Sequence, residues 1–329
     1  MPERNTMKKI QELQQVKGDA YDYYIAGNED TDLFEKIFLV DDIVEEICKP
    51  DKYFLIGEKG SGKTAYSVYM SKSDKINSFC SISLVENTLY QRFLNMKRQK
   101  ALELSSFKDV WINLIYLILA EKIRKEYGET FFSSIKYKQL SKAIDVFYSD
   151  AFKPEFVNAF EFVDNASASI NSMMKQGLFS TGTKASAETS QKYVEQSFQI
   201  SLLKIRDGFE KAFMSVNLKK PTILFVDGID ARPRDIDNEQ YFECLVGLVN
   251  AVLEMNQSFL KEKQIKIMLL IRPDIMYKMP VHNMNQKLRN NSVLLNWVTS
   301  YRKYIDSKLF KIADDYFMKQ QDYSYELGE

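Results

Sequence analysis

The stretch that decides the fold is Gly57-Glu58-Lys59-Gly60-Ser61-Gly62-Lys63-Thr64. It matches the pattern GxxxxGK[ST], follows the apolar run 52–56 (KYFLI) and precedes sequence that is compatible with a helix. Glycines let successive backbone N–H groups turn inward around a phosphate, and the following helix adds the positive end of its dipole. We therefore expect residues 57–64, together with Tyr66, to bind a nucleoside triphosphate. Lys63 would neutralise the β- and γ-phosphates, and the Thr64 hydroxyl would bind magnesium.

A second apolar run, 221–226 (PTILFV), ends at Asp227. A carboxylate at the tip of a buried strand is costly unless a positive group lies beside it, and a magnesium ion held through water would be that group. Gly228 follows, at the position where many ATPases carry a glutamate that activates water. Asp230 is the nearest replacement base, although its place in Asp-Gly-Ile-Asp fits an ordinary turn aspartate equally well.

A third apolar run, 265–271 (IKIMLLI), leads directly into Arg272. A guanidinium at this point can form paired hydrogen bonds with phosphate oxygens and sense the γ-phosphate. Arg232 and Arg234 follow the second run, where a surface salt bridge is the simpler explanation. Either could also reach a neighbouring subunit's nucleotide. The expected catalytic residues are Lys63, Asp227, Asp230 and Arg272.

The apolar runs indicate the fold class. The strand candidates are 52–56, 78–84, which has alternating character, and a short run at 292–295, together with 221–226 and 265–271, which are apolar almost throughout. This character is typical of parallel strands that are buried on both faces. The chain contains 12 glycines and 7 prolines in 329 residues, few enough to favour long helices. We expect an α/β fold with a mainly parallel sheet flanked by helices, and a large helical insert between the runs at 78–84 and 221–226.

The insert and the termini complete the expected organisation. Helical patterns fall near 106–128, 136–148, 154–163 and 191–213, and their apolar stripes are typical of packing surfaces. Residues 165–190, rich in Ser, Ala and Thr, predict a mobile loop or linker. The expected parts are an N-terminal helical segment over 1–33, the core over 34–90, the insert over 91–218, the rest of the core over 219–296, and a C-terminal helix and tail over 297–329.

Composition excludes several classes of protein. The 45 basic and 45 acidic residues cancel, which argues against coating nucleic acid through bulk charge. His282 is the single histidine, so a histidine dyad or a histidine metal cluster cannot form within one chain. The three cysteines are far apart and lack CxxC spacing, which favours a reducing compartment. No apolar run approaches the roughly 20 residues that span a bilayer, so we expect a cytoplasmic protein without membrane association.

Three motifs together resemble the core of the STAND class of P-loop NTPases, in the AAA+ and KAP neighbourhood. They are GEKGSGKT (57–64), ILFVDGID (223–230) and MLLIRPD (268–274). The long insert is similar to that of the KAP group, without that group's usual transmembrane helices. Residues 34–64 and 291–317 also resemble bacterial P-loop ATPases, some of which are associated with phage defence. The resemblance covers roughly residues 34–317 and implies Walker A and Walker B motifs that bind ATP and Mg²⁺.

Two departures from the resembled class shape the expected function. Ala231 stands where an acidic residue is usual, which implies slow intrinsic hydrolysis. The chain also has little room after the core for a winged helix or sensor repeats, so a sensing or effector domain would lie on another polypeptide. We expect a slow ATPase that acts as a nucleotide-dependent assembly switch or regulatory subunit in anti-phage defence. Its partners would be further copies of itself or a separate effector protein.

Two other functions remain open from the sequence. An ATP-dependent DNA loader or repair ATPase could use the basic clusters at 97–100 and 122–125, although such clusters are more often solvated helix faces, so nucleic acid is not the favoured partner. A small-molecule kinase is the weakest reading. The insert separates Thr64 from Asp227, and no acceptor-site motif is evident.

Overall fold

The computed structural model describes residues 12–25, 28–85, 107–132, 137–150, 202–230, 232, 237–279, 288, 290–296, 305 and 307–321. Several expectations therefore lie outside the described residues: the helix at 154–163, the loop at 165–190, Arg234, the basic cluster at 97–100 and His282.

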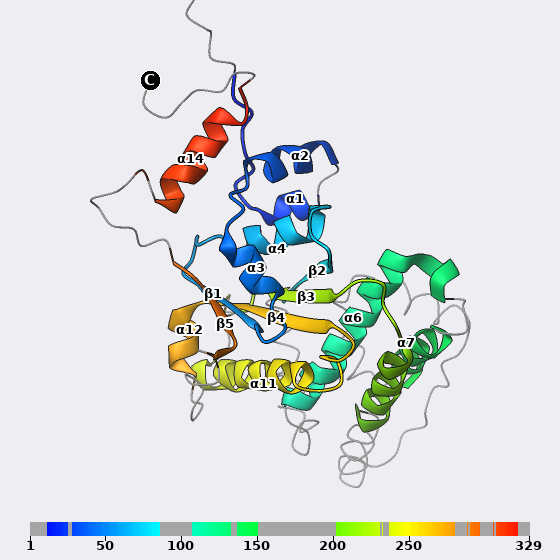
Figure 1. Cartoon of the computed structure of the whole chain (residues 1–329). Coiled ribbons are helices and arrows are strands. Elements are labelled where there is room, and N and C mark those ends of the chain that lie inside the picture. The colour runs from blue at the N-terminus through cyan, green and yellow to red at the C-terminus, as the bar shows by residue number, and fades with distance from the viewer. Residues whose placement is uncertain are drawn as a thin grey trace, which may run out of the picture.

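The centre of the fold is a parallel sheet of five strands (Figure 1). The strands are β1 (Phe54–Gly57), β2 (Phe79–Leu84), β3 (Thr222–Asp227), β4 (Ile265–Ile271) and β5 (Ser292–Leu295). All five expected strands are confirmed, each beginning within two residues of its apolar run. Every residue of β1, β3 and β4 is buried, as continuous apolar runs predict. The α/β class with a parallel sheet flanked by helices is thus confirmed.

The strand order is β2-β3-β4-β1-β5, and it positions the candidate site. After β1 the chain crosses to β2 at one edge and returns through β3 and β4. It then passes over β1 to reach β5 at the other edge. In open parallel sheets, ligands bind beyond the carboxyl ends of the strands, where the strand order reverses. Here that point is the end of β1, with the ends of β4 and β3 beside it.

Helices cover both faces of the sheet (Figure 1). Ile56 and Leu269 face a core shared with the helices Phe107–Phe132 (α6) and Asn238–Asn256 (α11), whereas Leu55 and Leu270 face a second core beneath the four helices between residues 21 and 72 (α1 to α4). Residues 202–215 are also helical. The other helices are α1 (Tyr21–Ile25), α2 (Asn28–Ile37), α3 (Asp42–Cys48), α4 (Lys63–Lys72), α6 (Phe107–Phe132), α7 (Lys138–Asp150), α11 (Asn238–Asn256), α12 (Pro273–Lys278) and α14 (Lys308–Met318).

Helix α6 shares one core with the sheet. Trp111 is buried, and its indole N–H donates to the carbonyl of Cys244 in α11 over 3.1 Å. The helical path is interrupted at Gly128 (φ 73°), where the sequence predicts an end. The expected helices at 106–128 and 136–148 are confirmed, as is the part of 191–213 that is described. Within the described ranges, no helix combines the length and apolar character that crossing a bilayer requires.

Candidate functional site

The glycine-rich loop, residues 57–62, joins β1 to α4 at the carboxyl edge of the sheet. Gly62 caps the helix with φ 89°, a left-handed conformation that favours glycine. At Gly57 an added Cβ would lie 2.2 Å from Ser61 Oγ and 3.0 Å from Leu295 Cβ, so a side chain does not fit. The loop thus brings its backbone and the N-terminus of a ten-residue helix to one point. Such an arrangement attracts anions.

Lys63, the first residue of α4, places its ammonium group over this loop. Its side chain is 8% exposed, and Nζ donates to the carbonyls of Gly57 (2.7 Å) and Glu58 (3.2 Å). Asp230 Oδ2 lies 3.8 Å from Nζ. Burial lowers the pKa of Lys63, whereas the Asp230 and Asp227 carboxylates raise it. The loop therefore holds a partly desolvated positive charge that a phosphate would stabilise.

Thr64 and Asp227 meet although 163 positions separate them in the chain. Thr64 Oγ1 donates to Asp227 Oδ2 over 2.6 Å, and the N–H of Gly228 donates to Oδ1 over 2.7 Å. Asp227 is 7% exposed, and burial raises its pKa against the effect of these two hydrogen bonds. A hydroxyl and a carboxylate are the hard oxygen ligands that Mg²⁺ prefers, so the pair fits that ion. Among the described residues no group of three His, Cys, Asp or Glu side chains gathers. A magnesium ion would thus complete its shell with water and phosphate.

Asp230 lies in the turn that follows β3, and its carboxylate lies beside Lys63. Its side chain is 25% exposed, and Oδ1 is buried without a hydrogen-bond partner. Burial raises the pKa of Asp230 to about 6, while the charge of Lys63 and the backbone N–H of Arg272 oppose the shift. A carboxyl with this pKa can accept a proton near neutral pH. The role of Asp230 as a base stays a prediction, because the residue both lies in a turn and contacts Lys63.

We expect Asp230→Asn to stabilise the chain at neutral pH. Because the Asp230 pKa is higher in the folded chain than the value of about 4 in an unfolded one, stability falls as pH rises from about 4 to about 6. The substitution should add about 1–2 kcal/mol to the free energy of unfolding at pH 7.5 and nothing at pH 4. Urea unfolding across this pH range measures the difference. A gain that is independent of pH would show that Asp230 is not the titrating group.

Arg272 directly follows β4, and its guanidinium is paired with the carboxylate of Asp274. Nε donates to Asp274 Oδ1 over 3.0 Å and Nη2 donates to Oδ2 over 2.8 Å. Its charge still contributes, after burial and the carboxylates, to the shift in the Lys63 pKa. Asp274 was not identified from the sequence, although an acidic residue two positions after Arg272 could have indicated this ion pair. A phosphate contact by Arg272 would exchange or share this partner. Arg232 is exposed and donates to Asn238.

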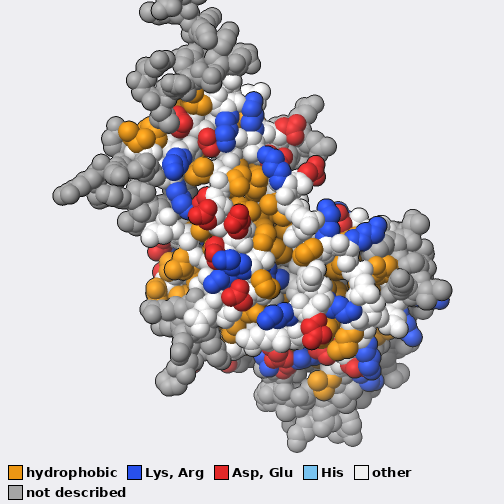
Figure 2. Space-filling model, in the orientation of Figure 1, with side chains coloured by type: hydrophobic (Ala, Val, Ile, Leu, Met, Phe, Trp, Pro, Cys, Tyr) orange, Lys and Arg blue, Asp and Glu red, His pale blue; other side chains and the backbone are white. Residues whose placement is uncertain are grey.

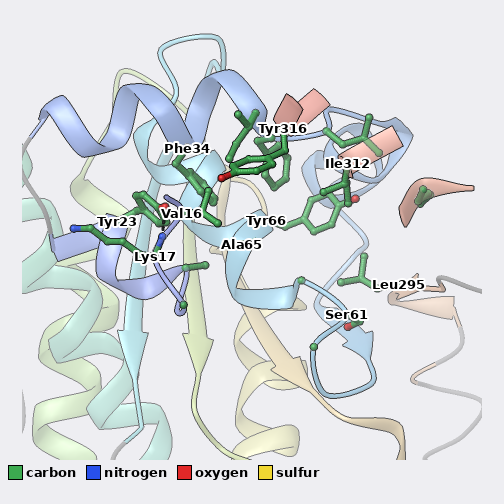
Figure 3. A pocket seen from close by; sticks show the side chains of 18 of the residues that line it. Val16, Lys17, Tyr23, Phe34, Ser61, Ala65, Tyr66, Leu295, Ile312 and Tyr316 are labelled. Atoms are coloured by element: carbon green, nitrogen blue, oxygen red, sulfur yellow. Dashed lines mark hydrogen bonds between the residues drawn. The ribbon is translucent and has the colours of Figure 1, made fainter. Parts of the chain in front are cut away.

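A cavity of about 370 Å³ lies directly beside the glycine-rich loop (Figure 3). Gly60, Ser61 and Gly62 form part of its wall, and Tyr66 lines it from α4. The rest of the lining is mostly apolar and aromatic, and comes from the N-terminal segment, α1, α2, β5 and α14. Figure 3 labels several of these side chains, among them Val16, Lys17, Tyr23, Phe34, Ala65, Leu295, Ile312 and Tyr316. Gly60, Ser61, Gly62 and Tyr66 were predicted from the sequence to bind nucleotide, whereas the other lining residues were not.

Hydrogen bonds join the α14 wall of this cavity to the rest of the chain. Asp41, which caps α3, accepts hydrogen bonds from the Tyr66 hydroxyl (2.9 Å) and from Lys308 Nζ (2.6 Å). The Tyr316 hydroxyl donates to the carbonyl of Gln14 over 2.8 Å. No side chain of α14 is fully buried. The cavity is therefore closed on this side by a helix that a few hydrogen bonds hold in place.

Comparisons of the chain with protein-family models, with curated proteins and with solved structures found no match.

Proposed function

We propose that the chain is a P-loop ATPase that binds Mg²⁺-ATP, hydrolyses it slowly and acts as a nucleotide-dependent assembly switch. The observation that carries this proposal is the convergence of Lys63, Thr64, Asp227 and Asp230 at the glycine-rich loop. The loop and Lys63 would bind the phosphates. Thr64 and Asp227 would hold the metal, which supplies charge neutralisation at the transferring phosphoryl group.

In this proposal, Asp230 serves as the base that accepts a proton from the attacking water. Its partly buried carboxylate lies on the same side of the loop as Lys63, and Gly228 leaves the position after Asp227 without a carboxylate. The positive charge of Lys63 stabilises the ionised Asp230 carboxylate, and this stabilisation is lost when Asp230 accepts a proton. We therefore expect slow turnover, as is suitable for a switch whose ATP-bound form must persist.

The cavity beside the loop would receive the nucleobase. It begins where the loop ends, and its aromatic side chains offer the flat apolar surface on which a base stacks. Its walls come from both the N-terminal segment and α14. Base binding would thus act directly on α14, and this supports a change in the exposed surface when nucleotide binds.

Filling this cavity tests the assignment of the base. Ala65→Leu places a larger side chain in the cavity, where it would occupy space that the base fills. We expect ATP affinity to fall roughly tenfold, because the displaced base loses its apolar contact with the other walls. Tripolyphosphate, which has no base, should bind the variant as it binds the original chain. Isothermal titration with both ligands in the presence of magnesium makes the comparison. An equal loss for both ligands would place the base elsewhere.

Assembly is measured by gel filtration with light scattering. We expect the mass to increase when magnesium and a non-hydrolysable ATP analogue are both present, and to remain unchanged with either alone. An unchanged mass when calorimetry shows nucleotide bound would contradict self-assembly, leaving a separate effector protein as the partner. A role in anti-phage defence rests on the resemblance of the three motifs and belongs to this proposal.

The alternative function, an ATP-dependent DNA-handling protein, finds less support. On the face seen in Figure 2, acidic and basic side chains are interspersed and do not form a stripe of one sign. In the cluster at 122–125, Arg124 is paired with Glu121 over 2.6 Å. ATP hydrolysis that DNA stimulates, and that falls steeply with salt, would favour this alternative.

A further inference from the structure

Lys266 is a buried lysine near the amino end of β4, whereas the candidate nucleotide site lies at the carboxyl ends of the strands. It is the second residue of β4, and its side chain is 7% exposed. The strand register aligns it with Ile223 in β3, which is aligned in turn with Cys80 in β2. An amine therefore lies in an otherwise apolar row across three strands, where a charge is costly unless it is paired.

Among the described residues, the hydrogen-bond partners of the amine are two main-chain carbonyls. Nζ donates to the carbonyl of Ile47 and, over 2.8 Å, to that of Lys49, both at the C-terminus of α3. Within the described part of the chain, Lys266 forms no ion pair with an acidic side chain. Burial lowers the pKa of Lys266 to about 8, against the opposing effects of Cys48, Cys80 and Asp51. Part of the population thus carries a neutral amine near physiological pH.

A cavity of about 270 Å³ gives small molecules a place beside this amine. Lys266 lines it together with the apolar side chains of Pro50 and Ile223 and the hydroxyl-bearing Ser78. Lys261, which is exposed, lines the same cavity and brings a positive charge. The cavity therefore combines a buried amine, an apolar wall and a cation.

We propose that Lys266 is a nucleophilic amine that forms a Schiff base with small aldehydes or ketones carrying an anionic group. A desolvated lysine without a carboxylate partner is the kind of amine that attacks carbonyl compounds. Lys261 would attract the anionic group and so direct the carbonyl carbon toward Nζ. This site is separate from the proposed nucleotide site and does not depend on it.

The chemistry needs no further reactant. The lone pair of neutral Nζ attacks the carbonyl carbon, and the carbonyl oxygen takes up a proton as nitrogen loses one. The resulting carbinolamine loses water as the C=N bond forms. Because the imine nitrogen has fewer N–H groups, the hydrogen bonds to Ile47 and Lys49 are weakened or lost when the adduct forms.

The test is reductive trapping on the full, unsubstituted chain. Glyoxylate, an aldehyde with a carboxylate, is added with cyanoborohydride, and peptide mapping measures the rate at each lysine. We expect Lys266 to be modified roughly tenfold faster than Lys261 at pH 7.5, because a larger fraction of a lysine with a lowered pKa is neutral. The Lys266 rate should rise with pH and level off above about pH 8. A Lys266 rate equal to or below that of Lys261 would overturn the proposal.

Two controls sharpen this result. Formaldehyde, which carries no charge, should show a smaller preference for Lys266 over Lys261 than glyoxylate does. An equal preference would show that the anionic group plays no part. Lys266→Arg keeps the positive charge and the N–H donors beneath α3 but removes the nucleophile. It should fold, as circular dichroism would report, and should lose the modification at position 266 while keeping that at Lys261.

Discussion

Lys63→Ala should lower the affinity for Mg²⁺-ATP by more than about 100-fold, or about 2.8 kcal/mol, and abolish nucleotide-dependent assembly. The reason is the position of Nζ, which contacts the carbonyls of Gly57 and Glu58 inside the glycine-rich loop. A charge-assisted contact to phosphate in a partly desolvated place is worth far more than one in water. Isothermal titration and light scattering on the same preparation measure both effects.

Lys59→Ala is the matched control, because Lys59 belongs to the same loop but is exposed. Its affinity for ATP should change by less than about twofold, as expected for a solvated surface charge. Thermal unfolding should show Lys63→Ala to be folded, since the substitution removes a desolvated charge along with its hydrogen bonds. Normal ATP affinity in Lys63→Ala would refute the phosphate site. Assembly of this variant without nucleotide would refute the switch.

Asp227→Asn should slow ATP hydrolysis by at least about 100-fold, while magnesium-free nucleotide binding changes little. Asparagine keeps the shape of the side chain, and its oxygen can accept from the Gly228 N–H while its NH2 group donates to Thr64 Oγ1, but it cannot supply the negative charge that Mg²⁺ requires. Phosphate release measured over a range of magnesium concentrations reports the loss. Since burial already raises the Asp227 pKa, the neutral variant should be at least as stable as the original chain near neutral pH.

Asp207→Asn provides the comparison for this variant, since Asp207 is exposed and pairs with Lys211 on the helix at 202–215. We expect it to hydrolyse ATP at the original rate. If Asp227→Asn keeps its rate and its dependence on magnesium, the metal is held elsewhere. The role of Thr64 as its second oxygen ligand would then also fail.

The strands of the sheet could be predicted because apolar runs are visible in short stretches of sequence. Each of the five expected runs is a strand in the structure, and the two runs that are apolar almost throughout, 221–226 and 265–271, correspond to strands in which every residue is buried. The meeting of Thr64 with Asp227 was predictable because the carboxyl ends of parallel strands share one edge. The position of Asp230 was not, since two readings fitted its spacing and only the folded loop places it 3.8 Å from Lys63.

The cavity could not be predicted for a different reason. Phe34, Ile312 and their neighbours have the composition of ordinary packing residues, and nothing in their local sequence says that they leave a space between them. Their proximity depends on how α2 and α14 pack. The contact of Lys308 with Asp41 is likewise set by tertiary structure, because 267 positions separate the two residues. Tyr66 was expected to bind nucleotide and lines the cavity, while its role there stays a prediction.

The place of β1 between β4 and β5 has a consequence for protein synthesis. Phe54 pairs with Leu269 on one side and with Ser292 on the other. A ribosome adding 5–20 residues per second needs roughly 10–40 s to advance from β1 to β4, the first of these two neighbours to be made. Throughout that interval the nascent apolar segment Phe54–Gly57 has neither neighbouring strand, which makes it a natural target for chaperones during translation.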